Sequence, residues 1–373
     1  METKRRSDLD WIRVLAFGLL ILYHIGMFFV SWKWHIKNNQ ISNSIEVPML
    51  FVNQWRLHLL FIISGMGSYY ALSNRTFILF IIERHNRLLI PLVFGMVFIV
   101  APQVYIERII SGATSDSFYN FYPHYFEGAY PNGNFSWHHL WFLPYLFVYS
   151  AILYPVFHYI KKNPDCKFIC TIKNLFNNTW NILLLLIPLT MIEIIMKPYF
   201  PTTHNLVNDW YVFTLFLFLY FYGFIFNIIG DVFWMFVEKY RKLYTIFGLF
   251  TFSAIILFTY CESNNLFLNI IHHFIVILNM WFWIIAILGF GTKYLNTKRN
   301  YMLKYLNQSV FPLYMLHQTV IVILAFFIYD KNINITAKFT LLTAATFLIC
   351  FSIFEIIKRF RLTRVLFGIK PMK

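Results

Sequence analysis

Long apolar stretches recur along the whole chain and constrain its fold more than any other feature. Each is about 20 residues long, the length that an α-helix needs to cross the hydrocarbon core of a bilayer. That core contains no water to satisfy backbone N–H and C=O groups, so single segments that cross it are helical. The expected spans are Leu9–Val30, Pro48–Leu72, Leu88–Ile109, His139–Ile160, Trp180–Met196, Trp210–Ile229, Tyr244–Cys261, Ile270–Gly291, Ser309–Tyr329 and Ala337–Ile357. The sequence therefore predicts an all-α integral membrane protein with about ten transmembrane helices, in a single polytopic domain over residues 1–373.

The composition agrees with a chain that lies largely in a bilayer. Hydrophobic residues make up 59% of the chain and charged residues only 13%, whereas a soluble globular protein is about a quarter charged. The formal net charge of +15 would suggest a nucleic-acid partner if the protein were soluble. Here the basic residues lie in short connections between the apolar stretches. We therefore expect the lipid bilayer, and no nucleic acid, around this chain.

The basic residues also predict an orientation. Cytoplasmic connections of membrane proteins carry an excess of lysine and arginine. With ten spans, both termini and the even-numbered connections fall on one side, which we assign to the cytoplasm. That side then holds Lys4, Arg5, Arg6, Arg75, Arg84, Arg87, Lys161, Lys162, Lys167, Lys173, Lys239, Arg241, Lys242, Lys293, Lys298, Arg299, Lys304, Lys358, Arg359, Arg361, Arg364, Lys370 and Lys373. The opposite side has only Lys33, Lys37, Arg56, Arg108, Lys197, Lys331 and Lys338.

Two ionisable residues, Arg13 and His24, lie inside the first apolar stretch. Ionisable residues within a membrane span are costly and are functional-site candidates by default. Their spacing is close to three helical turns, which places both side chains on nearly one face, about 16 Å apart along the axis. The predicted orientation puts Arg13 near the cytoplasmic surface and His24 in the outer half of the span.

Other polar groups in or near the spans each allow two interpretations. His317 follows Pro312, which frees backbone groups, so this histidine is either a site residue or an interhelical hydrogen-bonding partner. Arg84 and Arg87 either clamp phosphates or anchor the chain to anionic lipid, and position alone favours the anchor. Glu193 is an acid within the fifth expected span and a candidate for proton relay. The outer connection over residues 110–138, rich in aromatics, is either an interfacial belt or a sugar-binding lid.

Metal and nucleophile signatures give no further candidates. Cys166 and Cys170 form a C-x3-C pair without a second pair or a suitably spaced histidine, so we expect the four cysteines, with Cys261 and Cys350, to be free thiols. We predict no metal site. The chain also has no G-x-S-x-G elbow, P-loop or H-E-x-x-H motif.

Several motifs in order resemble the membrane-bound acyltransferase-3 family, and within it the glucan-modifying branch. The first span resembles the R-x10-H motif of the family at Arg13 and His24. LLFIISGM resembles an F-F-x-x-S-G signature at Ser64, and Arg84 and Arg87 form an R-x-x-R motif. HLWFL opens the fourth span with His139, and FPLYMLHQTVIV resembles a P-x-Y-x-L-H signature with Tyr314 and His317. The resemblance runs from about residue 8 to residue 370. One departure is that a glutamate common after the W-x-L of the fourth span is missing from PYLFVYS, which favours the glucan-modifying branch.

The resemblance implies an acyltransferase that moves an acyl group, commonly acetyl or succinyl, from cytosolic acyl-CoA to a hydroxyl of an extracytoplasmic glycan. It implies no tightly bound cofactor and a multi-pass location in the inner (plasma) membrane. His24 then serves as general base or is transiently acylated, and Arg13 orients His24 or binds donor phosphate. Arg84 and Arg87 bind the CoA phosphates, while His139, His317, Tyr314 and Ser64 are further polar candidates. The competing hypothesis is a transporter or flippase that moves a lipid-linked or acyl cargo without making bonds.

Overall fold

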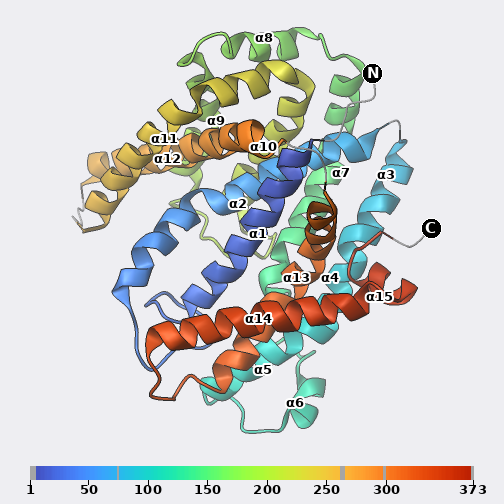
Figure 1. The fold of residues 1–373 in the computed structure, drawn as a ribbon, viewed down its shortest axis with the longest axis vertical. Helices are drawn as coiled ribbons and strands as arrows, with labels where there is room; N and C mark the ends of the chain where they lie inside the picture. Colours follow the sequence, from blue (N-terminus) through green and yellow to red (C-terminus); the bar gives the residue numbers. More distant parts are fainter. Residues whose placement is uncertain (1–5, 74, 261–264, 297–299, 371–373) are drawn as a thin grey trace. The chain divides into compact units, whose positions relative to one another are not determined.

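The structure is a computed structural model that describes residues 6–73, 75–260, 265–296 and 300–370 (Figure 1). The elements within those ranges are helices, joined by turns and irregular connections, which confirms the predicted all-α class. Cys166, Cys170 and Cys350 are free thiols, as expected. Some residues used in the predictions lie outside the described ranges, namely Lys4, Arg5, Cys261, Lys298, Arg299 and Lys373.

Nine helices of the described chain are long and apolar enough to cross a membrane, which makes this a multi-pass membrane protein. They match nine of the ten expected spans, although several begin or end a few residues away from the expected bounds. The side of the membrane on which each terminus lies stays a prediction. The nine candidate spans are Ser7–Met27, Asn43–Leu72, Phe77–Ile110, His138–Lys162, Trp210–Ile229, Asp231–Thr259, Leu266–Tyr294, Tyr301–Phe326 and Ile335–Ile357.

The expected span Trp180–Met196 differs from the prediction, because it forms only a shorter apolar helix, Asn181–Met196. Its first part is the 3₁₀ helix Asn181–Leu185, and the α-helix α9 (Leu186–Met196) follows. Pro188 is the third residue of α9. A proline lacks a backbone N–H, which an α-helix tolerates in its first turn but not in its interior, so the α-helix begins just before Pro188 instead of at the expected start of the span. The count of ten long spans is therefore corrected to nine plus this shorter helix.

The described residues divide into two compact units. Unit 1 comprises Met1–Ala16, Leu50–Ile81 and Val148–Leu303, and unit 2 comprises Phe17–Met49, Ile82–Phe147 and Lys304–Lys373. The single polytopic domain stays a prediction. Several helices have residues in both units.

The α-helices have the following bounds: α1 (Ser7–Met27), α2 (Asn43–Leu72), α3 (Phe77–Arg84), α4 (Ile90–Phe94), α5 (Ala101–Ile110), α6 (Phe118–His124), α7 (Phe142–Lys162), α8 (Lys167–Leu175), α9 as given above, α10 (Trp210–Ile229), α11 (Asp231–Tyr260), α12 (Leu266–Tyr294), α13 (Tyr301–Phe326), α14 (Ile335–Ile357) and α15 (Arg361–Leu366).

Unit 1 is held by close helix packing at small residues. A Cβ atom on Gly65 of α2 would overlap the backbone of Tyr220 on α10, and one on Gly223 of α10 would overlap the backbone of Ile62 on α2. Such contacts bring two backbones together, as is typical of membrane helices, where lipid provides no hydrophobic driving force between them. The long helices α11 and α12 also pack along each other in this unit (Figure 1). The glycine of the second-span motif is thus explained by packing.

Two π-helical turns interrupt the span Phe77–Ile110 in unit 2. They cover His85–Leu89 and Gly95–Val100, and each lies just before a proline near the start of the next α-helix, Pro91 or Pro102. A proline removes one i→i−4 hydrogen bond and pushes away the carbonyl four residues earlier, which a wider turn accommodates. Turns of this kind are frequent at functional sites, and these two precede α5, which carries Gln103 and Glu107.

The connection after α5 is ordered by one arginine. Arg108 donates hydrogen bonds to the side chain of Asn134 and to the backbone carbonyls of Pro131 and Gly133, at 2.8 to 3.0 Å. Tyr125, next to α6, donates to the carbonyls of Met96 and Ser136. The middle and the later part of residues 110–138 are therefore held against the helices of unit 2. Whether they form an aromatic belt or a sugar-binding lid stays open.

Candidate functional site

His24 and His317 meet within unit 2 to form an imidazole pair. His24 lies on α1 and His317 on α13, and their Nδ1 and Nε2 atoms are 2.8 Å apart. The rings are parallel, with centroids separated by 5.0 Å. His317 is fully buried, and His24 is partly exposed. The two histidines that the sequence singled out most strongly thus contact each other directly.

The neighbouring carbonyls determine which nitrogen carries each proton when both rings are neutral. His317 Nδ1 lies 2.7 Å from the carbonyl oxygen of Tyr314, and a carbonyl can only accept, so this nitrogen is protonated. His317 Nε2 is then an acceptor, and His24 Nδ1 donates to it. A neutral His24 therefore has its lone pair on Nε2. This tautomer leaves His24 able to accept a proton or to attack an electrophile.

His139 and Tyr314 extend the pair into a cluster, which we call the histidine cluster (His24, His139, Tyr314 and His317). Tyr314 donates its hydroxyl to the backbone carbonyl of His139 at 2.6 Å, and His139 Nε2 lies 3.0 Å from the carbonyl of Met315. The rings of His139 and His317 meet edge to face at 5.2 Å. His139 and Tyr314 are both buried. Their bonds hold the start of the fourth span against α13 and pack the ring of His139 against His317.

The other two candidates from the first two spans, Arg13 and Ser64, lie in unit 1. Arg13 shares α1 with His24, as expected, and its guanidinium lies 3.7 Å from Asp10, one turn earlier. It also lies beside α2 at Gly67. The Ser64 hydroxyl donates to the carbonyl of Leu60 on its own helix, at 2.8 Å. This bond within one helix gives Ser64 a local partner.

Arg84 and Arg87 share one carboxylate. Glu83 lies 3.5 Å from Arg84 and 3.3 Å from Arg87. The Arg84 side chain is 13% exposed, and that of Arg87 is 46% exposed. Two cations beside one anion keep a net positive charge, and the exposed guanidinium of Arg87 can still form a bidentate contact with a phosphate.

Unit 1 contains a basic pocket that the sequence did not single out. The pocket has a volume of about 610 Å³. Lys161 donates to the carbonyl of Tyr69, and Tyr154 donates to that of Arg75, so two side chains of the wall are held in place. Its lining residues are Ser73, Arg75, Thr76, Phe77, Tyr154, His158, Lys161 and Lys162. Cations and aromatic rings around one cavity suit an anionic ligand with an apolar or planar part.

Glu193 has several partners in unit 1. Its carboxylate lies 2.6 Å from Lys197 and 3.1 Å from His273, and it accepts a hydrogen bond from the hydroxyl of Tyr211. The carboxylate is 1% exposed. This arrangement explains how an acid is accommodated in an apolar helix, because buried charges are tolerated when they are paired and hydrogen-bonded. Its role in proton relay stays a prediction.

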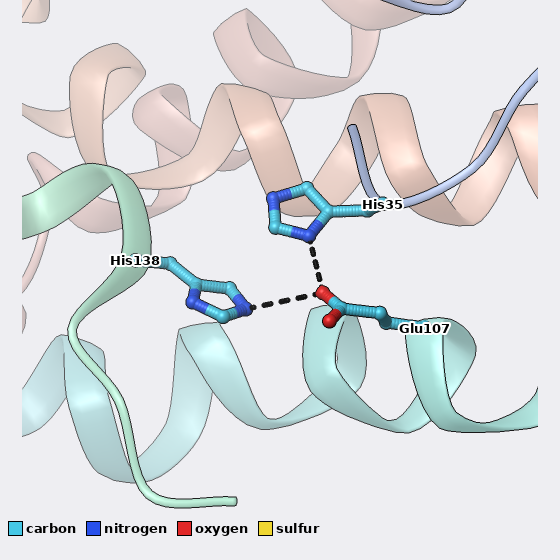
Figure 2. Close-up of side chains that lie close together, drawn as sticks. All are labelled: His35, Glu107 and His138. Carbon is cyan, nitrogen blue, oxygen red and sulfur yellow. Dashed lines mark hydrogen bonds and ion pairs between the residues drawn. The ribbon is translucent and has the colours of Figure 1, made fainter. Parts of the chain in front are cut away.

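Sequence reasoning missed a second polar cluster in unit 2. His35 Nδ1 lies 2.6 Å from Glu107, and His138 Nε2 lies 3.9 Å from the same carboxylate oxygen (Figure 2). Gln318 reaches His35, and Gln103 reaches His139, so two amides lie between this cluster and the histidine cluster. A histidine directly preceding His139 was the available signal, but nothing in the sequence indicated that residues 35, 107 and 138 would meet.

Comparison with known proteins identifies the family. The family described as an acyltransferase domain matches residues 6–355. The glucans biosynthesis protein C of Shigella dysenteriae serotype 1 is 25% identical over 170 residues, which is 44% of this chain and 42% of that protein. The glucans biosynthesis protein C of Escherichia coli strain K12 is 26% identical over 167 residues, with the same two shares. The match thus spans less than half the length of these relatives. No solved structure gives a significant match.

The family match covers nearly the whole described chain and confirms the resemblance seen in the motifs. The likeness to the two glucan proteins is distant and partial. The chain therefore belongs to the acyltransferase-3 family, which implies an acyltransferase for groups other than amino-acyl groups.

Proposed function

We propose that the protein is an integral membrane O-acyltransferase that transfers an acetyl or succinyl group from cytosolic acyl-CoA to a hydroxyl of an extracytoplasmic glycan. The observation that carries the proposal is the pair of His24 and His317, whose hydrogen bond leaves the lone pair of a neutral His24 on Nε2. The glycan acceptor draws on the partial likeness to the glucans biosynthesis proteins, and the inner-membrane location on the same likeness.

In the first route, His24 is a general base. Its Nε2 takes the proton of the acceptor hydroxyl as the oxygen attacks the thioester carbonyl carbon. The C–S bond then breaks, and the CoA thiolate takes the proton back from the imidazolium. His317 keeps the His24 ring in the correct tautomer and accepts the Nδ1–H bond of the imidazolium. The products are a glycan ester and free CoA.

In the second route, His24 is a nucleophile. Its Nε2 attacks the thioester carbonyl, the C–S bond breaks, and an acyl-imidazolium and a CoA thiolate result, the thiolate taking a proton from solvent. The acceptor hydroxyl then attacks the acyl carbon, the C–N bond breaks, and the hydroxyl proton passes to solvent, which restores the neutral ring. Both routes use the same lone pair. They differ in whether CoA is released before the acceptor binds.

Cations hold the donor in this proposal. Arg84 and Arg87 bind CoA phosphates, and Arg13 binds donor phosphate or orients the site from the cytoplasmic end of α1. The basic pocket around Arg75, Lys161 and Lys162 is a second place for the donor phosphates, since it combines cations with aromatic rings. No tightly bound cofactor is needed, because acyl-CoA binds as a substrate and leaves as free CoA.

The test uses the full-length purified chain in lipid nanodiscs. Radiolabelled acetyl-CoA or succinyl-CoA is supplied with a glucan oligosaccharide, and both free CoA and labelled ester are measured. The proposal predicts equal amounts of the two products from one of the donors. Movement of a lipid-linked or acyl cargo across reconstituted vesicles, without either product, would replace it with the transporter hypothesis. Release of CoA by the protein without acceptor, together with a labelled histidine, would select the acyl-imidazole route.

A further inference from the structure

We propose that His35, Glu107 and His138 form a binding site for a divalent transition-metal ion, with Zn²⁺ as the best match. The three residues come from three separate segments of unit 2: the connection after α1, the helix α5, and the 3₁₀ turn His138–Trp141 that begins the fourth span. Figure 2 shows both imidazoles directed toward the Glu107 carboxylate. The proposal is independent of the acyl-transfer reaction.

The ligand atoms lie close to the spacing that a metal requires. His35 Nδ1 is 2.6 Å from Glu107 Oε2, His138 Nε2 is 3.9 Å from the same oxygen, and all three atoms lie within 4.8 Å of one another. Zinc–nitrogen and zinc–oxygen bonds of about 2.0–2.2 Å in a tetrahedron place ligand atoms about 3.3 Å apart. The first distance must lengthen and the second must shorten, each by less than an ångström.

One nitrogen of this group is buried without a hydrogen-bond partner in the described chain. It is Nε2 of His138, whose side chain is only 3% exposed and whose nearest carboxylate oxygen is at 3.9 Å. An unpaired buried polar atom is costly, so such an atom in a folded protein calls for a ligand, water or ion. Here it points at a carboxylate that already faces a second imidazole (Figure 2). A cation between the three atoms would satisfy all of them.

Surrounding side chains orient two of the three ligands as in known zinc sites. Ser136 Oγ lies 2.9 Å from His138 Nδ1, and a proton on that nitrogen leaves Nε2 unprotonated for the metal. Tyr130 donates its hydroxyl to Glu107 Oε1 at 2.9 Å, which leaves Oε2 for the metal. Partners of this kind fix the tautomer of a ligating histidine and the direction of a ligating carboxylate.

The third ligand, His35, must move its ring proton from one nitrogen to the other before it can bind a metal. The amide nitrogen of Gln318, a donor, lies 2.9 Å from His35 Nε2, so the single proton of the neutral ring is on Nδ1, toward Glu107. Binding of a metal at Nδ1 requires this nitrogen to lose its proton and Nε2 to gain one from solvent, so that the ring stays neutral. The Gln318 amide must therefore turn over so that its oxygen accepts from the ring. Gln318 also bonds Gln103, so this turn extends toward His139.

The kind of ligand atoms in the site determines which metal ion fits best. Two imidazole nitrogens and one carboxylate oxygen suit Zn²⁺, whereas Mg²⁺ and Ca²⁺ prefer oxygen ligands alone. Three protein ligands leave a fourth position for water or a hydroxyl group. The side chains of His35 and Glu107 are 14% and 19% exposed, so an ion can reach them from outside. An ion bound at this site would connect the three segments through His138, the residue directly before His139.

The test measures metal binding by the full-length protein, purified through an affinity tag that contains no histidine and reconstituted in nanodiscs. After treatment with a chelator, Zn²⁺ or Co²⁺ is added, excess is removed by dialysis, and metal per chain is measured by mass spectrometry. The proposal predicts about one high-affinity ion per chain, with the visible absorption of four-coordinate Co²⁺. His138→Ala and Glu107→Gln should each weaken this binding at least about tenfold.

The matched control is His124→Ala. His124 also pairs with a glutamate, because its Nδ1 lies 2.8 Å from Glu127 in the connection over residues 110–138, but both side chains are well exposed. This variant should keep the wild-type stoichiometry and Co²⁺ spectrum. Equal metal content in wild type and in a folded His138→Ala protein would overturn the proposal. If neither ligand variant folds, a wild-type protein that binds no Co²⁺, or binds it without four-coordinate absorption, would overturn it as well.

Discussion

Two groups of histidines lie in unit 2, and they differ in what each imidazole faces. In the histidine cluster, His24 is bonded to another imidazole, that of His317. In the second cluster, which we call the His–Glu cluster (His35, Glu107 and His138), both rings face a carboxylate. The first arrangement leaves a ring nitrogen of His24 to exchange a proton or bind an acyl group, whereas the second gathers negative charge and lone pairs that suit a cation.

This difference shows that histidine content alone does not identify the chemistry of a site. The partner of each ring decides it, because the bond at one nitrogen determines what the other can do. The clusters are also linked, since Gln103 and Gln318 bond each other and reach His139 and His35 respectively. If variants in one cluster lower only acyl transfer and variants in the other lower only metal content, then the two clusters have separate functions.

The largest effect among variants that retain His24 is expected at His317. His317→Leu removes the acceptor that fixes the tautomer of His24, and should lower kcat about 100-fold, within the range of general acid–base contributions. His317→Gln can still accept from His24 Nδ1 and should retain more activity than the leucine variant. Metal content should stay at the wild-type value in both. Ester formation at an unchanged rate in a folded His317→Leu protein would break the comparison.

A smaller effect is expected from the arginines, and it should appear in KM. Replacing Arg84 and Arg87 with glutamine should raise the KM for acyl-CoA about tenfold, or about 1.4 kcal/mol, with little change in kcat. Glu83→Gln should act in the opposite direction, because it removes the carboxylate that both guanidiniums now share. Steady-state kinetics with varied donor measures both. Unchanged KM values in the double variant, but raised values in Lys161→Gln, would assign the donor phosphates to the basic pocket.

Gln103→Leu tests how strongly the two clusters are coupled. The amide nitrogen of Gln103 donates to Thr319 at 2.6 Å and lies 3.4 Å from His139 Nδ1, and its oxygen accepts from Gln318 at 3.1 Å, so its loss removes hydrogen bonds from buried side chains. Such a loss costs about 1–3 kcal/mol of stability. A several-fold loss of transfer with metal binding retained would indicate weak coupling. Loss of metal binding in a folded variant would show that the clusters act as one site.

The smallest effect is expected at Ser64. Its hydroxyl is bonded to the carbonyl of Leu60 on the same helix, so Ser64→Ala should change the transfer rate less than about twofold, as is usual for a bond of this kind. Ser253, which bonds Leu249 in the same way on α11, provides the matched control. A large loss of activity in Ser64→Ala alone would place part of the chemistry outside the histidine cluster.

Several features could be predicted from the sequence because they depend on local pattern. Apolar length predicted nine of the spans, and the placement of Arg13 and His24 on one helix followed from their spacing in the first stretch. The motif order predicted the family. The shorter helix Asn181–Met196 was not predicted, because hydropathy does not register that Pro188 is tolerated in the first turn of an α-helix but not in its interior.

Contacts between distant residues could not be predicted in the same way. His24 and His317 are 293 positions apart, and their bond depends on how α1 and α13 pack. His35 and Glu107 are 72 positions apart, and neither lies in a recognisable ligand spacing. The pairing of Arg84 and Arg87 with Glu83 was visible in the sequence as ERHNR, but the motif directed attention to the arginines alone.

The central claim is that His24 supplies the reactive nitrogen for acyl transfer. The most direct test compares initial rates of ester formation by wild type, His24→Ala and the control His124→Ala, in nanodiscs and at saturating donor. Each protein must show the wild-type elution volume and thermal midpoint.

The account predicts that His24→Ala loses at least about 100-fold in rate, while its metal content and the rate of His124→Ala stay unchanged. Equal rates of ester formation by wild type and a folded His24→Ala protein would contradict it.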